Sequence, residues 1–279
     1  ICANAYLGAE PLVEALASGA DVVVTGRVAD PSLALAPFAY FHGWSLDDAR
    51  LAACGTAAGH LLECGAQVTG GYYADPGFKD VPHPERIGFP IVAMRRDGSF
   101  TITRADDAGG LVDRHTVTEQ LLYEIHDPAS YLTPDVTLDI TQVELAEVGA
   151  DCVRVEGVRG RPRPDRLKVT VSHDAGWFGE AEISYAGPNA LARARLALDV
   201  VRRRMPEGVR MRGDLIGVAS VFNDDEGTWL DHQAVDPLAP RDIRLRIAVS
   251  APDRAVAARA PEEVLALYCA GPAGGGGIR

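Results

Sequence analysis

Residues 10–41 read EPLVEALASGADVVVTGRVADPSLALAPFAYF, and this stretch sets the expected fold class. Pro11 stands in the first turn of an amphipathic helix that ends at Ser18-Gly19. Residues 22–24 are three valines, as in a strand covered on both faces. Residues 30–32 then resemble the start of a helix that runs over 33–41. Helix, buried strand, loop and helix together predict a parallel α/β sheet.

The rest of the chain divides into two patterns. Helices are predicted over 46–63 and 116–125, and the Asp97-Gly98 turn predicts a β-hairpin between residues 91 and 103. After residue 127 short alternating segments predict antiparallel strands, with one long helix over 189–205 and a further strand over 243–249. We therefore expect an α/β part over 1–126 and an α+β part over 127–279.

The two ends of the sequence indicate a fragment. The first residue is Ile1 rather than Met, and the last residues include the run of four glycines over 274–277. A glycine run signals a loop rather than the end of a domain. Both predicted parts are thus expected to be truncated, the first at its N-terminus and the second at its C-terminus.

Composition excludes several classes of protein. The 279 residues are 47% hydrophobic and 24% charged, which is typical of a globular chain with a sizeable core. The net charge of −12 disfavours a nucleic-acid partner. Residues 154–212 nevertheless carry 13 basic and seven acidic side chains, a local net charge of +6. This segment suits a small anionic ligand or an acidic partner subunit, or it reflects unselected arginines on a solvated face.

Cysteine usage and hydropathy point to the cytoplasm. The five cysteines are an odd number, are widely spread and form no C-x-x-C motif, which argues against a disulfide scaffold or a zinc ribbon. No stretch reaches the roughly 18 consecutive apolar residues that a membrane span requires. We expect a cytoplasmic protein with no membrane contact.

The loop after the predicted buried strand is the first candidate site. Ligands of open α/β sheets bind beside the carboxyl ends of strands and the N-termini of helices. Thr25, Gly26, Arg27 and Asp30 lie in this loop, where Arg27 would bind a carboxylate or phosphate and Asp30 a hydroxyl. The alternative is that Asp30 only caps the following helix and Arg27 pairs with it.

The predicted helix over 46–63 carries the second candidate site. It is almost wholly apolar or small, so we expect it to be buried, with Gly55 and Gly59 allowing another backbone to approach. One polar stripe lies at positions i, i+4, i+7 and i+11 and consists of Thr56, His60, Glu63 and Gln67. Burial would tune His60 and Glu63 toward acid–base catalysis; the alternative is a structural pair in the core. No second ligand pair accompanies them, so no metal site is predicted.

A glycine pair, Gly109-Gly110, precedes the predicted helix over 116–125 and is the third candidate. It allows a backbone to approach a ligand closely, or it simply forms a tight turn. His115 and Glu119 favour an exposed helix face over a site. Neither a G-x-G-x-x-G dinucleotide fingerprint nor a P-loop is present, and the sequence leaves the cofactor unknown.

Six segments of the sequence form a recognisable combination. They are ANAYLG (3–8), VVVTGRVADPSL (22–33), GHLLECGAQVTGG (59–71), TEQLLYEI (118–125), YLTPDV (131–136) and the closing glycine run. Asn4, in the first of these segments, is also predicted to bind substrate. Together the segments resemble the acyclic terpene utilisation (AtuA) family, over nearly the whole chain. The resemblance implies a longer protein that acts in the breakdown of acyclic terpenoid or similar branched acids through acyl-CoA intermediates. The resemblance indicates a metabolic pathway but identifies no catalytic residue.

Two functional hypotheses follow. The first is a catabolic enzyme that acts on a branched acyl-CoA or hydroxy acid by lyase- or hydratase-like chemistry. In it, His60 and Glu63 transfer the proton, and the loop of residues 25–30 binds an anionic substrate such as a CoA ester. The second is a non-catalytic subunit that binds another enzyme of the pathway. A homo-oligomer is compatible with either hypothesis.

Overall fold

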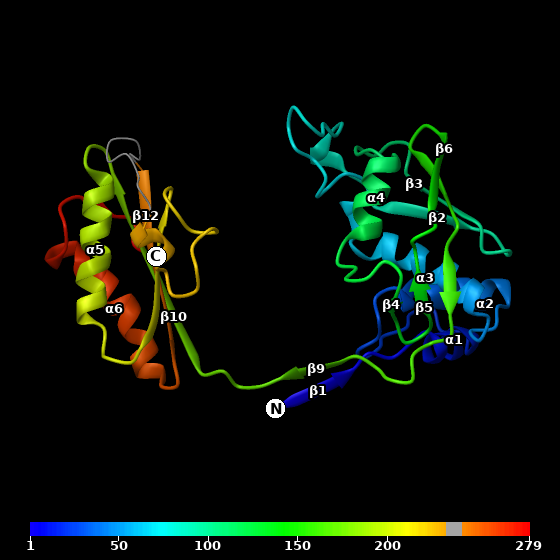
Figure 1. Cartoon of the computed structure of the whole chain (residues 1–279), viewed down its shortest axis with the longest axis horizontal. Coiled ribbons are helices and arrows are strands. Elements are labelled where there is room, and N and C mark those ends of the chain that lie inside the picture. Colours follow the sequence, from blue (N-terminus) through cyan, green and yellow to red (C-terminus); the bar gives the residue numbers. More distant parts are fainter. Residues whose placement is uncertain (233–241) are drawn as a thin grey trace. The chain divides into compact units, whose positions relative to one another are not determined.

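The computed structural model describes residues 1–232 and 242–279, which divide into two compact units, residues 1–172 and residues 173–279 (Figure 1). This division differs from the boundary at residues 126/127 that the sequence predicts. Strand β3 (Phe100–Arg104) pairs with β7 (Cys152–Glu156), so strands from both sides of the predicted boundary belong to one sheet. The alternation of apolar and polar residues within a strand does not indicate which distant strand it pairs with.

The first unit combines four α-helices with three small antiparallel sheets. The sheet orders are β2-β3-β7-β6, β4-β5-β8 and β1-β9. The helices are α1 (Glu10–Ala17), α2 (Ser32–His42), α3 (Ala49–Glu63) and α4 (Arg114–Leu122), with 3-10 turns at Gly65–Gln67 and Pro84–Arg86. The other strands are β1 (Cys2–Ala5), β2 (Pro90–Met94), β4 (Tyr131–Leu132), β5 (Thr137–Asp139), β6 (Glu144–Gly149), β8 (Arg159–Arg161) and β9 (Val169–Ser172).

The prediction of a parallel sheet in this part of the chain is wrong. All the described sheets are antiparallel, and residues 22–24 form no strand. Val22 and Val24 are 79% and 90% exposed. Valine favours extended backbone, but a strand also needs a neighbour to complete its ladder of hydrogen bonds. The parallel contact nearest to these valines is a single bridge between Leu7 and Val28.

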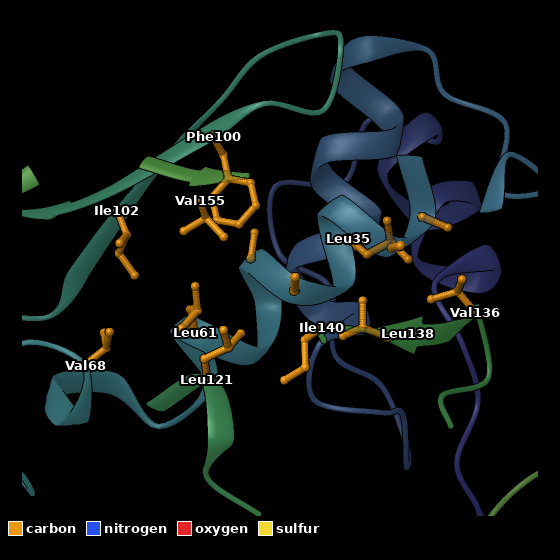
Figure 2. Packing of buried hydrophobic residues seen from close by; sticks show 14 of the residues in the cluster. Leu35, Leu61, Val68, Phe100, Ile102, Leu121, Val136, Leu138, Ile140 and Val155 are labelled. Carbon is orange, nitrogen blue, oxygen red and sulfur yellow. The ribbon is translucent and has the colours of Figure 1, made fainter. Parts of the chain in front are cut away.

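Helix α3 is the centre of the first unit, as its composition predicts. Asp48 caps it by accepting from the backbone N–H groups of Arg50 and Leu51, at 3.0 and 3.1 Å. The ten residues from 52 to 61 are all buried. Leu61 of α3 lies in the same core as Leu121 of α4, and side chains of the surrounding elements complete that core (Figure 2). A helix buried on every side must present small residues to its neighbours.

The predicted close approach at Gly55 and Gly59 is confirmed. A Cβ atom built at Gly59 would lie 2.8 Å from the Cα atom of Pro31, at the start of α2. A Cβ atom at Gly55 would lie 2.5 Å from a methyl carbon of Leu35 in the same helix. Glycine at both positions therefore sets the distance between α2 and α3.

The carboxylate of Asp135 connects three segments of the first unit. It is buried, and one oxygen accepts from the backbone N–H of Ala9 at 2.7 Å, at the start of α1. The other oxygen accepts from the hydroxyl of Ser32 at 2.5 Å, at the start of α2. A negative charge at a helix N-terminus is favourable because the helix dipole is positive there. Asp135 thus fixes α1 and α2 to the segment that leads into β5.

Over residues 173–232 and 242–279, the second unit is an antiparallel sheet with the order β11-β12-β10-β13, packed against two helices. Its core joins apolar residues of α5 and α6 to alternate residues of the strands. The sequence predicted the long α5, but not β11 or α6. The elements are β10 (Trp177–Ala186), α5 (Ala190–Arg204), β11 (Arg210–Ile216), a 3-10 turn (Trp229–His232), β12 (Asp242–Ala251), α6 (Arg254–Ala270) and β13 (Gly275–Gly276).

The α2–α3 contact predicts the effect of Gly59→Ala. The added methyl group meets backbone atoms of Pro31, which cannot rotate away, so the two helices must separate. We expect the free energy of unfolding to fall by about 1–3 kcal/mol, despite the better helix propensity of alanine. Urea unfolding followed by circular dichroism measures this change. Gly26→Ala is the matched control, because a Cβ atom there has no neighbour within 4 Å. Equal stability of the two variants would contradict the packing argument.

The Asp135 contacts predict that Asp135→Asn destabilises the first unit. The new amide group places a donor where Ala9 or Ser32 already donates, so one buried donor loses its acceptor. We expect a loss of about 1–3 kcal/mol in the free energy of unfolding. Asp165→Asn, at an exposed aspartate, is the control in the same urea titration. A loss no larger than that of the control would show that Asp135 is dispensable.

Candidate functional site

The predicted pair His60 and Glu63 meets near the C-terminal end of α3. Nδ1 of His60 lies 2.8 Å from Oε1 of Glu63. The imidazole is 1% exposed and the Glu63 side chain 12% exposed, so the pair lies at the edge of the core. A spacing of three residues places both side chains on the same face of a helix.

This hydrogen bond determines which ring nitrogen of His60 holds the proton. A carboxylate oxygen only accepts, so Nδ1 is the donor and Nε2 keeps a free lone pair. Within the described residues, the buried Nε2 has no hydrogen-bond partner. An unpaired buried polar atom is costly, and such atoms are uncommon in folded proteins. A histidine held by a carboxylate through one nitrogen and free at the other has the arrangement of a general base.

Helix α4 and strand β4 supply the surroundings of His60. The ring of Tyr131, the first residue of β4, lies edge-on to the imidazole with 5.6 Å between ring centroids. Gln120 of α4 donates from its amide nitrogen to the backbone carbonyl of His60 at 3.0 Å. The amide oxygen of Gln120 is buried and lacks a partner among the described residues. Two unsatisfied polar atoms, His60 Nε2 and Gln120 Oε1, therefore occur in one neighbourhood.

Acidic side chains also lie near Cys64, as their effect on the pKa of its thiol indicates. Burial raises the pKa of Cys64, a hydrogen bond with Gln120 lowers it, and the charges of Glu63, Glu124 and Asp30 raise it further. Asp30 is the one residue of the 25–30 loop whose charge acts on Cys64 in this way. The thiol is held in its neutral form, so Cys64 is a weak nucleophile.

Tyr131 experiences the same environment. Burial raises the pKa of the Tyr131 phenol strongly, and the charges of Glu63, Asp30 and Glu124 raise it further. Low polarity and nearby negative charge both disfavour the phenolate. Tyr131 therefore remains a protonated phenol that can donate a hydrogen bond.

The polar stripe predicted along this helix holds only in part. The Thr56 hydroxyl is buried one turn before His60 and has no partner among the described residues. Helix α3 ends at Glu63, and Gly65 adopts a positive φ of 55° in the turn that follows. Gln67 therefore lies in a 3-10 turn and does not extend the helix face. The stripe is interrupted because residues at this spacing lie on one face only within a continuous helix.

Asn4, Thr25 and Arg27 contact residues other than His60. Asn4 is on the exposed strand β1, where its amide contacts the sulfur of Cys2 at 3.5 Å. The hydroxyl of Thr25 donates to the carbonyl of Gly26 at 3.1 Å. Arg27 lies over the ring of Tyr6. Helix α2 has Pro31 at its N-cap and no side-chain cap, so the capping role considered for Asp30 is wrong.

Gly109 and Gly110 pack against protein backbone. The N–H of Gly109 donates to the carbonyl of Arg86 at 2.8 Å, and that of Gly110 donates to the carbonyl of Pro82 at 2.8 Å. Gly110 has a φ of +103°, and a Cβ atom there would lie 2.6 Å from the carbonyl oxygen of Thr69. These contacts favour the tight-turn alternative, because both amides are already bonded.

Metal ligation has no support in the described residues, since no group of three histidine, cysteine, aspartate or glutamate side chains there could hold an ion. The residues that sequence reasoning missed are Gln120, Glu124, Tyr131 and Cys64. All four occur in the segments that carry the family resemblance. The contacts of Gln120 and Tyr131 with His60 depend on how α3, α4 and β4 pack, which a single sequence does not show.

The described residues therefore combine helices with antiparallel sheets in two compact units, with a carboxylate-bound histidine in the first. The chain belongs to the acyclic terpene utilisation family, because the model of the family described as "Acyclic terpene utilisation family protein AtuA" matches residues 1–279. Membership implies a role in acyclic terpene utilisation. No curated protein and no solved structure matches the chain. In residues 1–232 and 242–279, no helix has both the length and the apolar character needed to cross a bilayer.

The environment of Tyr131 predicts a loss of stability at alkaline pH. The folded-state pKa of this phenol is raised above the ordinary value of 10.0. The neutral phenol of Tyr131 therefore contributes fully to the free energy of unfolding below pH 10. This contribution is lost at higher pH, where the phenol ionises in the unfolded chain but not in the folded chain. Tyr131→Phe should make the free energy of unfolding fall less steeply between pH 9.5 and 11. Urea titrations measure the slope, and Tyr268→Phe, at an exposed tyrosine, is the control. A slope unchanged by Tyr131→Phe would contradict this prediction.

Proposed function

We propose that the chain is part of an enzyme that moves a proton on a branched acyl-CoA or hydroxy-acid substrate, in lyase- or hydratase-like chemistry. The observation that carries the proposal is His60, whose Nδ1 is bound by Glu63 while Nε2 is buried without a partner. Burial of an unsatisfied nitrogen lowers stability, and such costs concentrate at functional sites. The family indicates the pathway, and the geometry of His60 and Glu63 supports acid–base chemistry.

His60 and Glu63 carry out the proton transfer. Nε2 of His60 removes the proton from the carbon beside the substrate carbonyl, and Glu63 stabilises the resulting imidazolium. The imidazolium returns this proton to the hydroxyl group on the next carbon, which leaves as water while the carbon–carbon double bond forms. Hydration runs the same steps in reverse. The phenol of Tyr131 stays protonated and donates a hydrogen bond to the substrate.

Access to Nε2 requires a side chain to move. The Tyr131 ring contacts the imidazole and is only partly buried, so it is the group that must rotate aside. It belongs to a two-residue strand that pairs with β5 alone, which is among the weaker elements of the unit. This placement keeps water away from the base until a substrate replaces the ring.

Deuterium exchange tests the proposal directly. The full-length protein is incubated in D2O with a panel of branched acyl-CoAs and 3-hydroxyacyl-CoAs, and mass spectrometry follows deuterium at the carbon beside the carbonyl and loss of water. His60→Asn should reduce exchange by about 10²–10⁴-fold, because that is the usual contribution of a general base. Glu63→Gln should reduce it less, since the ring keeps its lone pair.

His115→Asn is the matched control, because His115 is an exposed histidine of α4. Circular dichroism verifies that each variant is folded. Exchange that persists in a folded His60→Asn variant would overturn the assignment of the base. No exchange by the wild-type protein on any member of the panel would overturn the proposed chemistry.

An exposed apolar pair favours a second candidate, a subunit that binds another enzyme of the pathway. Val221 and Phe222 are adjacent in the second unit and are 90% and 84% exposed. Neighbouring exposed apolar side chains are typical of interaction sites. This role predicts that Phe222→Asp abolishes co-purification with a pathway enzyme while His60→Asn does not.

A further inference from the structure

The ring of Tyr6 brings two cationic side chains together in the first unit. The guanidinium carbon of Arg27 lies 5.1 Å from the ring centroid, and the ammonium nitrogen of Lys168 lies 4.8 Å from it. The two charged groups are therefore at most about 10 Å apart. Lys168 is one of only two lysines in the chain.

Backbone hydrogen bonds fix this arrangement. The N–H of Tyr6 donates to the carbonyl of Lys168 at 2.9 Å, continuing the ladder between β1 and β9. The N–H of Leu7 donates to the carbonyl of Arg27 at 3.2 Å. The hydroxyl of Thr170 donates to that of Tyr6 at 3.2 Å and holds the ring. Three separate segments thus place the two cations, so their proximity does not depend on flexible side chains alone.

The two positive charges are not balanced. In the part of the chain that the structure describes, neither the Arg27 nor the Lys168 side chain forms an ion pair with a carboxylate. The other lysine, Lys79, behaves differently and bonds to the Glu119 carboxylate. Like charges held close together repel each other, and a bound anion removes this repulsion.

Two adjoining hollows lie on the side of Lys168, and Arg27 lines neither of them. The larger, of about 450 Å³, is lined by Lys168 and by apolar side chains such as Leu132. The smaller, of about 190 Å³, includes Leu7 and Arg163, and both hollows share Pro134 and Leu167. Arg163 and Arg166 add positive charge at the walls, whereas Asp165, Glu10 and Asp135 add negative charge. Cationic side chains thus lie next to apolar lining residues.

We propose that Arg27 and Lys168 bind the phosphate of an organic phosphate ester, whose organic part lies in the hollow over Leu167 and Pro134. A phosphate monoester carries a charge of about −1.5 to −2 at pH 7 and a terminal diphosphate carries more, so either matches two separate cations better than a monocarboxylate does. The planar guanidinium of Arg27 supplies paired N–H donors, and Lys168 supplies a point charge. The site shares no residue with the acid–base pair and stands independently of the proposed reaction.

Calorimetric titration of the full-length protein with ADP, pyrophosphate, orthophosphate and acetate tests this site. We expect ADP and pyrophosphate to bind more tightly than acetate, with affinity falling as salt increases. Arg27→Gln and Lys168→Met should each weaken ADP binding at least tenfold. Lys168→Arg should retain most of it, because the charge remains. If ADP binds more tightly than pyrophosphate, the hollow holds the organic part of the ligand. If the two bind equally, the hollow does not hold it, and the proposed place of the organic part is overturned.

Two controls separate this site from general surface charge. Arg210→Gln removes an exposed arginine from the second unit, and Lys79→Met removes the other lysine. Both substitutions should change the affinity for ADP less than twofold. The proposal is overturned if acetate binds as tightly as pyrophosphate, if Lys168→Met leaves affinity unchanged, or if Arg210→Gln weakens binding as much as Arg27→Gln.

Discussion

The structure of the first unit depends on the enclosure of one helix. Helix α3 is buried over ten consecutive residues, and its neighbours approach at distances that glycine and alanine allow. At Gly59 the neighbour is the backbone of Pro31, so the separation of α2 and α3 is set by main-chain atoms. Interiors packed at this density respond to a change of a single methyl group. Sheets from both halves of the unit then close over the same helix.

Enclosure determines the chemistry available to the polar side chains of that helix. His60 and Thr56 cannot reach water, so each needs a partner within the protein. Glu63 satisfies one nitrogen of His60, and Gln120 approaches from α4 but bonds to the backbone carbonyl. The other imidazole nitrogen is left free at a cost of about 1–3 kcal/mol. That cost distinguishes His60 from an ordinary core histidine, whose two nitrogens would both be paired.

Local sequence signals predicted most of the helices and the β2–β3 hairpin. Asp97-Gly98, a hairpin turn, acts within a few residues, which explains why the predicted hairpin is confirmed. The valines of residues 22–24 show the limit of this reasoning, because propensity for extended backbone does not supply a pairing partner. The predicted boundary at residue 127 has the same weakness, since the β3–β7 pairing crosses it.

The sequence by itself determined that α3 is a small-residue helix, that His60 and Glu63 share one of its faces, and that the chain belongs to its family. These properties depend on periodicity and on motif content, both of which a linear sequence contains. Only the tertiary structure decided that Tyr131 and Gln120 surround His60, that Gln67 does not, and that Lys168 lies beside Arg27 on the ring of Tyr6. These neighbours are up to about 160 residues apart along the chain, and backbone pairing and packing, not local propensity, bring them together.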